Sequence, residues 1–291
     1  MIHEKSLVIL MAAYNGMKYI DEQIQSILAQ NNVSLHIFIS VDLSSDDTHE
    51  HCKVMEEKDS RITVLEYGER FGGAGKNFFR LIRDVDLSSF DYVALADQDD
   101  IWLPDKLFRA VRAIEEKGID AYSSNVTAFW STGRRELIKK SYPQRKYDYF
   151  FEAAGPGCTY VFKSASLARF KSFLFQNEDA VHLVSMHDWM LYAFFRASGM
   201  RWYIDDYASM LYRQHASNQV GSNSGLSAFH KRIAMIRSHW YRNEVVKITM
   251  LLSSLGSVPL DRLFLLRNGY ELRRRPRDCL ALFIFILLGI F

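Results

Sequence analysis

The chain has 291 residues, of which 48% are hydrophobic, including 20 Phe and 15 Tyr. This composition excludes a disordered protein and allows one large domain or a domain with an appendage. The formal net charge of +2 gives no argument for nucleic acid as a partner. Cys52, Cys158 and Cys279 lie far apart, so neither a disulfide framework nor a structural zinc site is expected. The first apolar run is too short for a signal peptide, which makes a cytoplasmic location our expectation.

Apolar runs alternate with helical periodicities along the first 120 residues. Strands are predicted at 7–11, 35–41, 62–65 and 92–96, and helices at 20–28, 48–58, 78–84 and 107–117. Strands that alternate with helices favour βαβ units with right-handed crossovers. The sequence therefore predicts a Rossmann-like α/β fold, with a mostly parallel sheet flanked by helices and a ligand crevice outside the carboxyl ends of the strands.

The strand at 92–96 ends in Asp97, Asp99 and Asp100. The two-residue period of a strand places Asp97 and Asp99 on the same side of the backbone, where two carboxylates need a compensating cation. Oxygen ligands at a strand end suit Mg²⁺ or Mn²⁺. The alternative is a solvated acidic turn before the helix that starts near Pro104. Asp42 ends the strand at 35–41 in the same way, so we expect it to share this site.

The glycine-rich segment 68–77 invites comparison with phosphate-binding loops. It is not a Walker A loop, because Arg70 and Asn77 stand where Gly and Ser or Thr are required. It is not GxGxxG either, since Phe78 replaces the last glycine. Glycines still allow close approach of backbone to a ligand, so Arg70 or Lys76 can lie near a nucleotide phosphate or base. A flexible turn before a helix is the alternative.

The pattern after residue 120 is less regular. We expect a strand at 122–130, a basic surface loop at 134–146, a glycine turn and short strand at 155–162, and another strand at 202–204. The glycines of the turn either let an acceptor pass close to the backbone or simply introduce the strand. Asp188 lies at the start of a helix with an aromatic stripe, where it caps the helix or acts as a base.

Beyond residue 226 the pattern changes to long helices, with one expected at 229–253. We therefore divide the chain into a catalytic domain at 1–225 and a helical extension at 226–291. The extension ends in an arginine cluster at 273–277 and thirteen uncharged residues. As a helix this run is about 20 Å long and does not span the roughly 30 Å hydrocarbon core. We expect it to insert into an anionic inner leaflet, so that deleting 273–291 leaves the catalytic domain intact. Packing on the catalytic domain or on a dimer partner is the alternative.

Five segments in order, at 12–16, 41–48, 97–102, 187–189 and 212–215, resemble family 2 glycosyltransferases of the GT-A fold. The resemblance covers roughly residues 6–225. Within the family, the segment 97–104 followed by 187–189 most resembles bacterial rhamnosyltransferases of surface-polysaccharide assembly. The resemblance implies an inverting transfer from a nucleotide-diphosphate sugar, dTDP-rhamnose, to a lipid-linked saccharide such as O-antigen or capsule. It also implies Mn²⁺ or Mg²⁺ as cofactor. The basic and apolar end of the chain makes peripheral attachment to the cytoplasmic face of the inner membrane our expectation. The QxxRW signature is absent, which favours transfer of a single sugar.

The resemblance assigns roles residue by residue. We expect seven residues to bind the nucleotide sugar, of which Lys76 comes from the glycine-rich segment. They are Ala13, Tyr14, Asn15, Asp42, Lys76, Asp97 and Gln98. Within this set Tyr14 and Asp42 hold the nucleobase and Asp97 lies toward the ribose. The sequence departs from the family at Leu43 and Ser44, where an acidic residue and a glycine are common.

The remaining roles concern the chemistry itself. Asp99 binds the metal on the diphosphate, His215 lies near it, and Asp188 matches the general base. Two other classes stay open: a nucleotidyltransferase on a similar sheet, and a catalytically silent subunit of polysaccharide assembly. The presence of all three residues together with Asp97 argues against silence.

Overall fold

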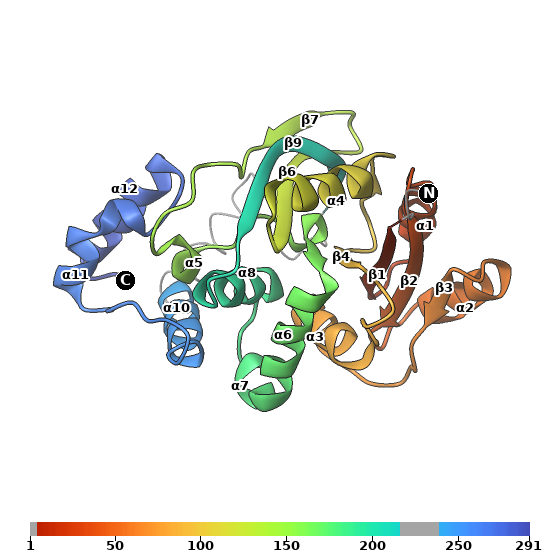
Figure 1. Ribbon diagram of the computed structural model, residues 1–291, viewed down its shortest axis with the longest axis horizontal. Coiled ribbons are helices and arrows are strands. Elements are labelled where there is room, and N and C mark those ends of the chain that lie inside the picture. The colour runs from red at the N-terminus through yellow and green to blue at the C-terminus, as the bar shows by residue number, and fades with distance from the viewer. Residues whose placement is uncertain (1–4, 216–238) are drawn as a thin grey trace.

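The computed structural model describes residues 5–215 and 239–291. Up to residue 215, nine strands form one sheet in the order β3-β2-β1-β4-β8-β6-β9-β5, with β7 paired to β6 (Figure 1). The strands are β1 (Ser6–Ala13), β2 (Ser34–Val41), β3 (Ile62–Val64), β4 (Tyr92–Ala96), β5 (Ile101–Trp102), β6 (Ala121–Phe129), β7 (Arg135–Ile138), β8 (Val161–Lys163) and β9 (Trp202–Arg213).

The amino-terminal half of the sheet is parallel, as the sequence predicts. β1 lies between β2 and β4, parallel to both, and β3 extends the same arrangement. Seven of the eight residues of β1 are buried, because its continuous apolar run faces helices on both sides. The helices are α1 (Ile20–Leu28), α2 (Thr48–Lys58), α3 (Ala74–Asp84), α4 (Lys106–Lys117), α5 (Asp148–Phe151), α6 (Ser164–Gln176), α7 (Glu178–Val181), α8 (His187–Ala197), α10 (Trp240–Leu251), α11 (Arg262–Arg267) and α12 (Pro276–Leu287).

The other half of the sheet is mixed, so the expectation of a mostly parallel sheet is wrong there. β8 runs antiparallel to both β4 and β6, and β5 runs antiparallel to β9. The segment expected as a basic loop contains β7, which forms a hairpin with β6 through a turn at Gly133, whose φ is 82°. β7 is largely exposed, and its two polar residues precede its two apolar ones, so it lacks the apolar alternation by which a strand is predicted.

Two cores lie on opposite faces of the sheet. Leu7 and Ile9 pack with α1, α2 and α4, whereas Val8 and Leu10 pack with α3, α6 and α8. This division follows from the two-residue period of a strand, which sends successive side chains to opposite faces. The sheet is therefore the middle layer of three.

The carboxyl-terminal helices α10, α11 and α12 lie at the end of the molecule opposite α1 and α2 (Figure 1). Val245, Leu265 and Leu282 belong to the same core as α3 and α8, so this extension packs continuously onto the catalytic domain. Residues 229–238 of the expected helix and the expected domain boundary at 225 lie outside the described residues. No helix within 5–215 or 239–291 is long and apolar enough to cross a membrane.

The arginine cluster of the extension is not a free basic patch, which corrects the sequence-based hypothesis. Arg274 is 2% exposed, and its guanidinium lies 3.3 Å from Asp148 and 3.5 Å from Glu152. Arg273 lies 3.6 Å from the same Glu152. Arg274 therefore belongs to the interior of the protein and Arg273 is partly buried beside it. Deleting 273–291 would remove part of the core, which includes Leu282 and Ile286. Arg275 and Arg277 remain at the surface.

Candidate active site

The predicted site residues gather at the carboxyl ends of the parallel strands. Ala13 ends β1 opposite Val41 of β2, and Ala96 of β4 pairs with Met11. Because these ends are almost level, the loops that follow them meet at one edge of the sheet. The first turns of α3 and α8 and the end of β9 complete this edge.

Tyr14 and Gln98 tie two of these loops together. The Tyr14 amide donates to Gln98 Oε1 at 2.7 Å, and Gln98 Nε2 donates back to the Tyr14 carbonyl at 2.8 Å. A Cβ at Gly16 would collide with the same Gln98 side chain, which would have to leave its position between the two loops. The phenol ring of Tyr14 stays 46% exposed and is accessible to a ligand.

Asp42 and Asn15 hold the neighbouring loops in place. The Asp42 carboxylate is 4% exposed and accepts hydrogen bonds from the backbone amides of Phe71 and Gly72, each at 2.9 Å. It therefore fastens the glycine-rich segment to the end of β2. Asn15 Oδ1 accepts from the Ser45 amide at 2.8 Å, which ties the loop after β1 to the loop after β2.

The glycine-rich segment leads directly into α3. Gly72 has a φ of 79° and Gly73 a φ of 153°, so the chain uses backbone conformations that favour glycine before the helix begins. α3 starts at Ala74, four residues before the expected Phe78. Lys76 lies exposed in its first turn.

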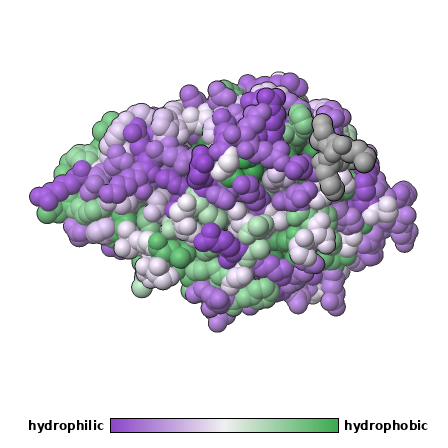
Figure 2. All heavy atoms as spheres, viewed as in Figure 1, coloured by the Kyte–Doolittle hydropathy of each residue, from purple (hydrophilic) through white to green (hydrophobic). Residues whose placement is uncertain are grey.

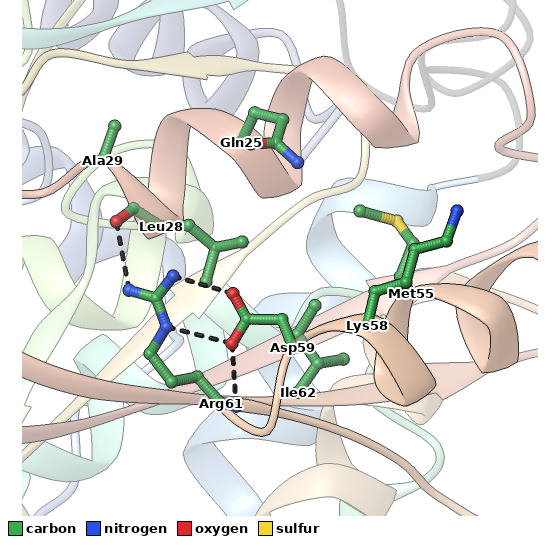
Figure 3. A pocket seen from close by; sticks show the side chains of 8 residues that line it. All are labelled: Gln25, Leu28, Ala29, Met55, Lys58, Asp59, Arg61 and Ile62. Carbon is green, nitrogen blue, oxygen red and sulfur yellow. Dashed lines mark hydrogen bonds and ion pairs between the residues drawn. The ribbon is translucent and has the colours of Figure 1, made fainter.

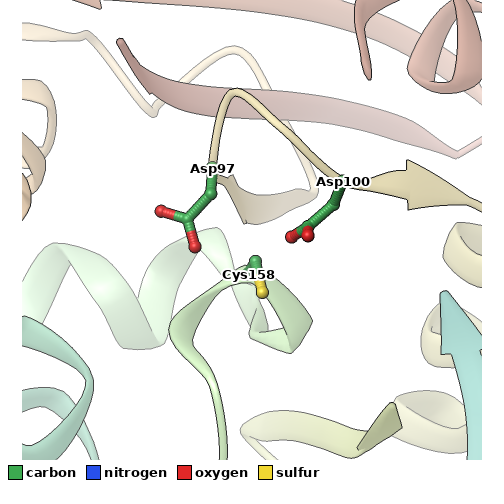
Figure 4. A group of neighbouring side chains, drawn as sticks. All are labelled: Asp97, Asp100 and Cys158. Atoms are coloured by element: carbon green, nitrogen blue, oxygen red, sulfur yellow. The ribbon is translucent and has the colours of Figure 1, made fainter. Parts of the chain in front are cut away.

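Behind the acidic loop, buried Cys158 joins two of the predicted aspartates in a cluster, in which Asp100 is buried and Asp97 partly buried. Ligand atoms of Asp97, Asp100 and Cys158 all lie within 4.8 Å of one another, and Figure 4 shows Cys158 facing the loop that carries both aspartates. Burial, followed by the charge of Asp99, raises the pKa of Asp97 to about 7. The same two causes raise the pKa of Asp100 well above its usual range. No spacing rule indicates Cys158, because it belongs to a turn more than fifty residues away.

Asp99 has a different environment from its two neighbours. Its Oδ2 lies 2.6 Å from Nε2 of His215, and its carbonyl accepts from the Arg213 side chain at 2.7 Å. The Asp99 and His215 side chains are 14% and 21% exposed. A carboxylate oxygen at the mouth of an acidic loop is a suitable donor for Mn²⁺ or Mg²⁺, and an imidazole nitrogen beside it is a donor that transition-metal ions take more readily than Mg²⁺ does. The residues present thus fit a divalent cation.

Asp188 lies in the first turn of α8 and belongs to the same site. It is 9% exposed, its Oδ1 accepts from the Trp189 amide at 2.8 Å, and its charge acts on Asp97. Burial raises the pKa of Asp188 to about 6. A carboxylate with this pKa is ionised at neutral pH and still basic enough to accept a proton.

The glycines of the 155–157 turn make room for side chains. A Cβ at Gly157 would collide with the ring of His187, and a Cβ at Gly155 would lie 3.4 Å from Cγ of Lys140. His187 stacks on Phe78 at 4.1 Å, and burial lowers its pKa to about 3, so it is neutral. Both glycines therefore serve local packing next to Asp188.

Two surface cavities lie at the opposite edge of the sheet, near the amino ends of the strands. One, of about 390 Å³, is lined by Asp59, Arg61 and residues of α1 and α2 (Figure 3). Its arginine is already paired with Asp59 at 2.7 Å. The other, of about 590 Å³, lies beside Lys117 and Trp202. Neither contains a residue of the acidic loop.

Comparisons with known proteins agree with this geometry. The family model described as glycosyl transferase family 2 matches residues 8–175. The dTDP-rhamnosyl transferase RfbG of Shigella flexneri is 44% identical over 289 residues, covering 97% of this chain and 100% of that protein. WfgD of Escherichia coli, a UDP-Glc:alpha-D-GlcNAc-diphosphoundecaprenol beta-1,3-glucosyltransferase, is 27% identical over 179 residues. That match covers 60% of this chain and 66% of WfgD.

Solved structures share the fold. TarS 1-349 of S. aureus in complex with UDP-GlcNAc superposes with a TM-score of 0.57 at 17% identity, covering 97% of this chain and 81% of that chain. A mannosyltransferase of Pyrobaculum calidifontis in complex with GDP-Man and Mn²⁺ gives a TM-score of 0.53 at 15% identity, covering 99% and 86%. At these identities the likeness concerns the fold alone.

Proposed function

Because the chain belongs to glycosyl transferase family 2, we propose that it transfers rhamnose from dTDP-rhamnose to a hydroxyl of a growing cell-surface polysaccharide, with inversion at the anomeric carbon. The observation that carries the proposal is the 44% identity to a dTDP-rhamnosyl transferase over 97% of the chain. Family membership makes the protein a glycosyltransferase and supports this chemistry over that of a nucleotidyltransferase or a silent subunit. The sugar, the acceptor and the stereochemistry are the proposed part.

The donor is proposed to bind across the loops after β1, β2 and β4. The exposed ring of Tyr14 is suited to stack on the nucleobase, beside Ala13, Asn15 and the loop that Asp42 holds. Asp97 and Gln98 directly follow β4, and in this proposal Asp97 lies toward the ribose while Gln98 belongs to the same nucleotide-sugar site. Lys76 at the start of α3 offers a cation to the diphosphate.

Asp99 and His215 would hold Mn²⁺ or Mg²⁺, since their side chains already lie together at 2.6 Å. A bound divalent cation supplies charge stabilisation to the departing nucleoside diphosphate, typically several kcal/mol. The protein residues around the donor hold the diphosphate and the sugar in line with the acceptor. Positioning of this kind lowers the barrier by fixing the reacting atoms in advance.

The transfer itself needs one base. The acceptor oxygen forms a bond to the anomeric carbon from the face opposite the leaving group, while the bond between that carbon and the phosphate oxygen breaks. The proton of the acceptor hydroxyl passes to the Asp188 carboxylate, and the electron pair of the broken bond leaves with the diphosphate. A positioned base contributes roughly 10²–10⁴-fold to such a step.

We further propose that the protein works at the cytoplasmic face of the inner membrane on a lipid-linked acceptor. The outer face of α12 is apolar, and Figure 2 shows hydrophobic spheres among polar ones at the end where Figure 1 places α11 and α12. Arg275 and Arg277 lie at the start of this helix and can meet anionic headgroups. Coverage of the same face by a second copy of the chain is the competing arrangement. The exposed apolar residues here are Leu280, Phe283, Ile284 and Leu287 of α12 and Leu288 directly after it.

The test is turnover of a panel of nucleotide sugars by the purified full-length protein, with Mn²⁺, Mg²⁺ or EDTA and a saccharide acceptor analogue. We expect dTDP-rhamnose to be consumed in a metal-dependent manner, with a product whose anomeric configuration by NMR is opposite to that of the donor. Release of pyrophosphate from dTTP would instead identify a nucleotidyltransferase. Retention of configuration, or preference for another sugar nucleotide, would overturn the corresponding part of the proposal.

A further inference from the structure

The helix α10 of the carboxyl-terminal extension contacts the segment that leads to the candidate base. Its Glu244 is 0% exposed, and Oε2 of this buried carboxylate accepts from the backbone amide of Ser185 at 2.8 Å. Ser185 lies three residues before Asp188, just ahead of α8. Because hydrogen bonds must compensate a buried carboxylate for its loss of water, this bond ties the start of α8 firmly to α10.

The same short segment is held from two further sides. Lys247, one turn after Glu244 in α10, donates to the Leu183 carbonyl at 2.9 Å and to Glu244 Oε1 at 2.6 Å. On the side of α3, the Ser185 carbonyl lies so close to Gly75 that an added Cβ would be 2.9 Å from its oxygen. The amide and the carbonyl of Ser185 are therefore both fixed, which leaves the chain little freedom where α8 begins.

A second residue of α10 contacts the chain directly after the base. The ring of Tyr241 stacks on the Trp189 indole with centroids 5.7 Å apart, and the indole nitrogen donates to the Tyr149 carbonyl at 3.1 Å. The backbone amide of Trp189 is the donor to Asp188 Oδ1 at 2.8 Å. The residue that Tyr241 packs against is thus the one whose amide orients the carboxylate.

α10 is itself anchored beside α5 and α8 (Figure 1). The Tyr241 hydroxyl donates to the Phe151 carbonyl at 2.7 Å and accepts from Arg273 at 3.0 Å. Ile248 belongs to the core that also contains residues of α3 and α8. Tyr241, Glu244 and Ile248 recur at helical spacing, so one face of α10 carries these contacts. The position of α8 therefore depends on a helix of the extension.

We propose that Glu244 and Tyr241 are positioning residues for the transfer reaction, which hold the first turn of α8 so that the Asp188 carboxylate meets the acceptor hydroxyl. This inference rests on the proposed function, in which Asp188 is the base. Neither residue belongs to a motif of the family resemblance. Both lie beyond residue 225, where the sequence pattern placed no residue of the active site.

The test measures kcat and the Kd for dTDP-rhamnose in two matched pairs of full-length variants. Glu244→Gln keeps an oxygen that can accept from the Ser185 amide, whereas Glu244→Leu does not. Tyr241→Phe keeps the ring that stacks on Trp189, whereas Tyr241→Leu does not. Since a misplacement of 1 Å can cost about 10²-fold, we expect each leucine variant to lower kcat by about tenfold or more. The Kd should stay within about twofold of wild type, because the donor loops are untouched. The Gln and Phe variants should keep most of the wild-type kcat.

Leu282→Ala separates positioning from a general loss of stability. Leu282 of α12 is 4% exposed and belongs to the same core, so its truncation should lower Tm. It leaves Glu244 and Tyr241 in place, and its kcat well below Tm should match that of the wild-type enzyme.

Two pairs keep the test decisive if one leucine variant fails to fold. A wild-type kcat in either folded leucine variant would overturn the inference, as would an equal fall in Leu282→Ala or equal falls within both pairs. A wild-type protein that does not consume dTDP-rhamnose would instead refute the proposed function, and the positioning roles with it. Active wild-type enzyme with an unchanged kcat in the leucine variants refutes the positioning roles alone.

Discussion

Replacing Arg274 by methionine tests whether the arginine cluster belongs to the protein interior. Methionine keeps much of the length and apolar volume of the side chain but removes its charge and its donors. In the native protein the Arg274 guanidinium reaches Asp148 at 3.3 Å and the Ala153 carbonyl at 2.5 Å. Asp148 is 0% exposed, so the substitution withdraws one counter-charge from a buried carboxylate.

The size of the effect follows from what remains around Asp148. Removing one partner of a buried ion pair typically costs about 3–5 kcal/mol. Asp148 keeps Arg196 at 3.3 Å and the Tyr192 hydroxyl at 3.0 Å, so we expect the lower end of that range. About 3 kcal/mol corresponds to a fall in Tm of roughly 6 °C or more for a protein of this size.

The assay is thermal and urea unfolding of Arg274→Met beside Arg275→Met, whose side chain lies nearer the surface. The control should change the free energy of unfolding by less than about 0.5 kcal/mol. Equal stability of the two variants would refute the reasoning and restore the hypothesis of a free basic patch. In that case Arg274→Met should weaken binding to anionic liposomes without weakening the fold.

Three further predictions concern the site and the tail. Asp188→Asn should lower kcat by about 10²–10⁴-fold with little change in donor affinity. The kcat of the wild-type enzyme should fall as the pH drops through about 6, because burial raises the pKa of Asp188 to that value. A collapse of donor affinity at unchanged kcat would contradict a role as base. Asp99→Ala should abolish the Mn²⁺-dependent thermal stabilisation by donor while leaving the fold intact, and normal metal-supplemented activity would disprove the metal assignment. Serine at Leu280 and Ile284 of α12 and at Leu288 directly after it, all exposed, should reduce flotation with anionic liposomes at unchanged Tm. Equal flotation would leave a second copy of the chain as the partner of that face.

The sequence by itself determined the parallel half of the fold and the edge where the site lies. Runs such as 7–11 and 35–41 are apolar throughout, and such runs form buried parallel strands when helices alternate with them. The aspartates that follow two of these strands were predicted to share one edge, and their backbones do lie at that edge. These inferences succeeded because they depend on periodicities within ten or so residues.

The tertiary structure alone decided which distant residues meet. Cys158 joins Asp97 because β8 inserts antiparallel beside β4, and short strands of this kind carry no local signal of their direction. Arg274 reaches Asp148 across 126 residues of chain, and the sequence presented it only as one of several arginines before an apolar run. A basic cluster has the same pattern whether water, lipid or a buried carboxylate surrounds it. Its environment is set by the packing of α5, α8 and the extension, which no spacing within the cluster encodes.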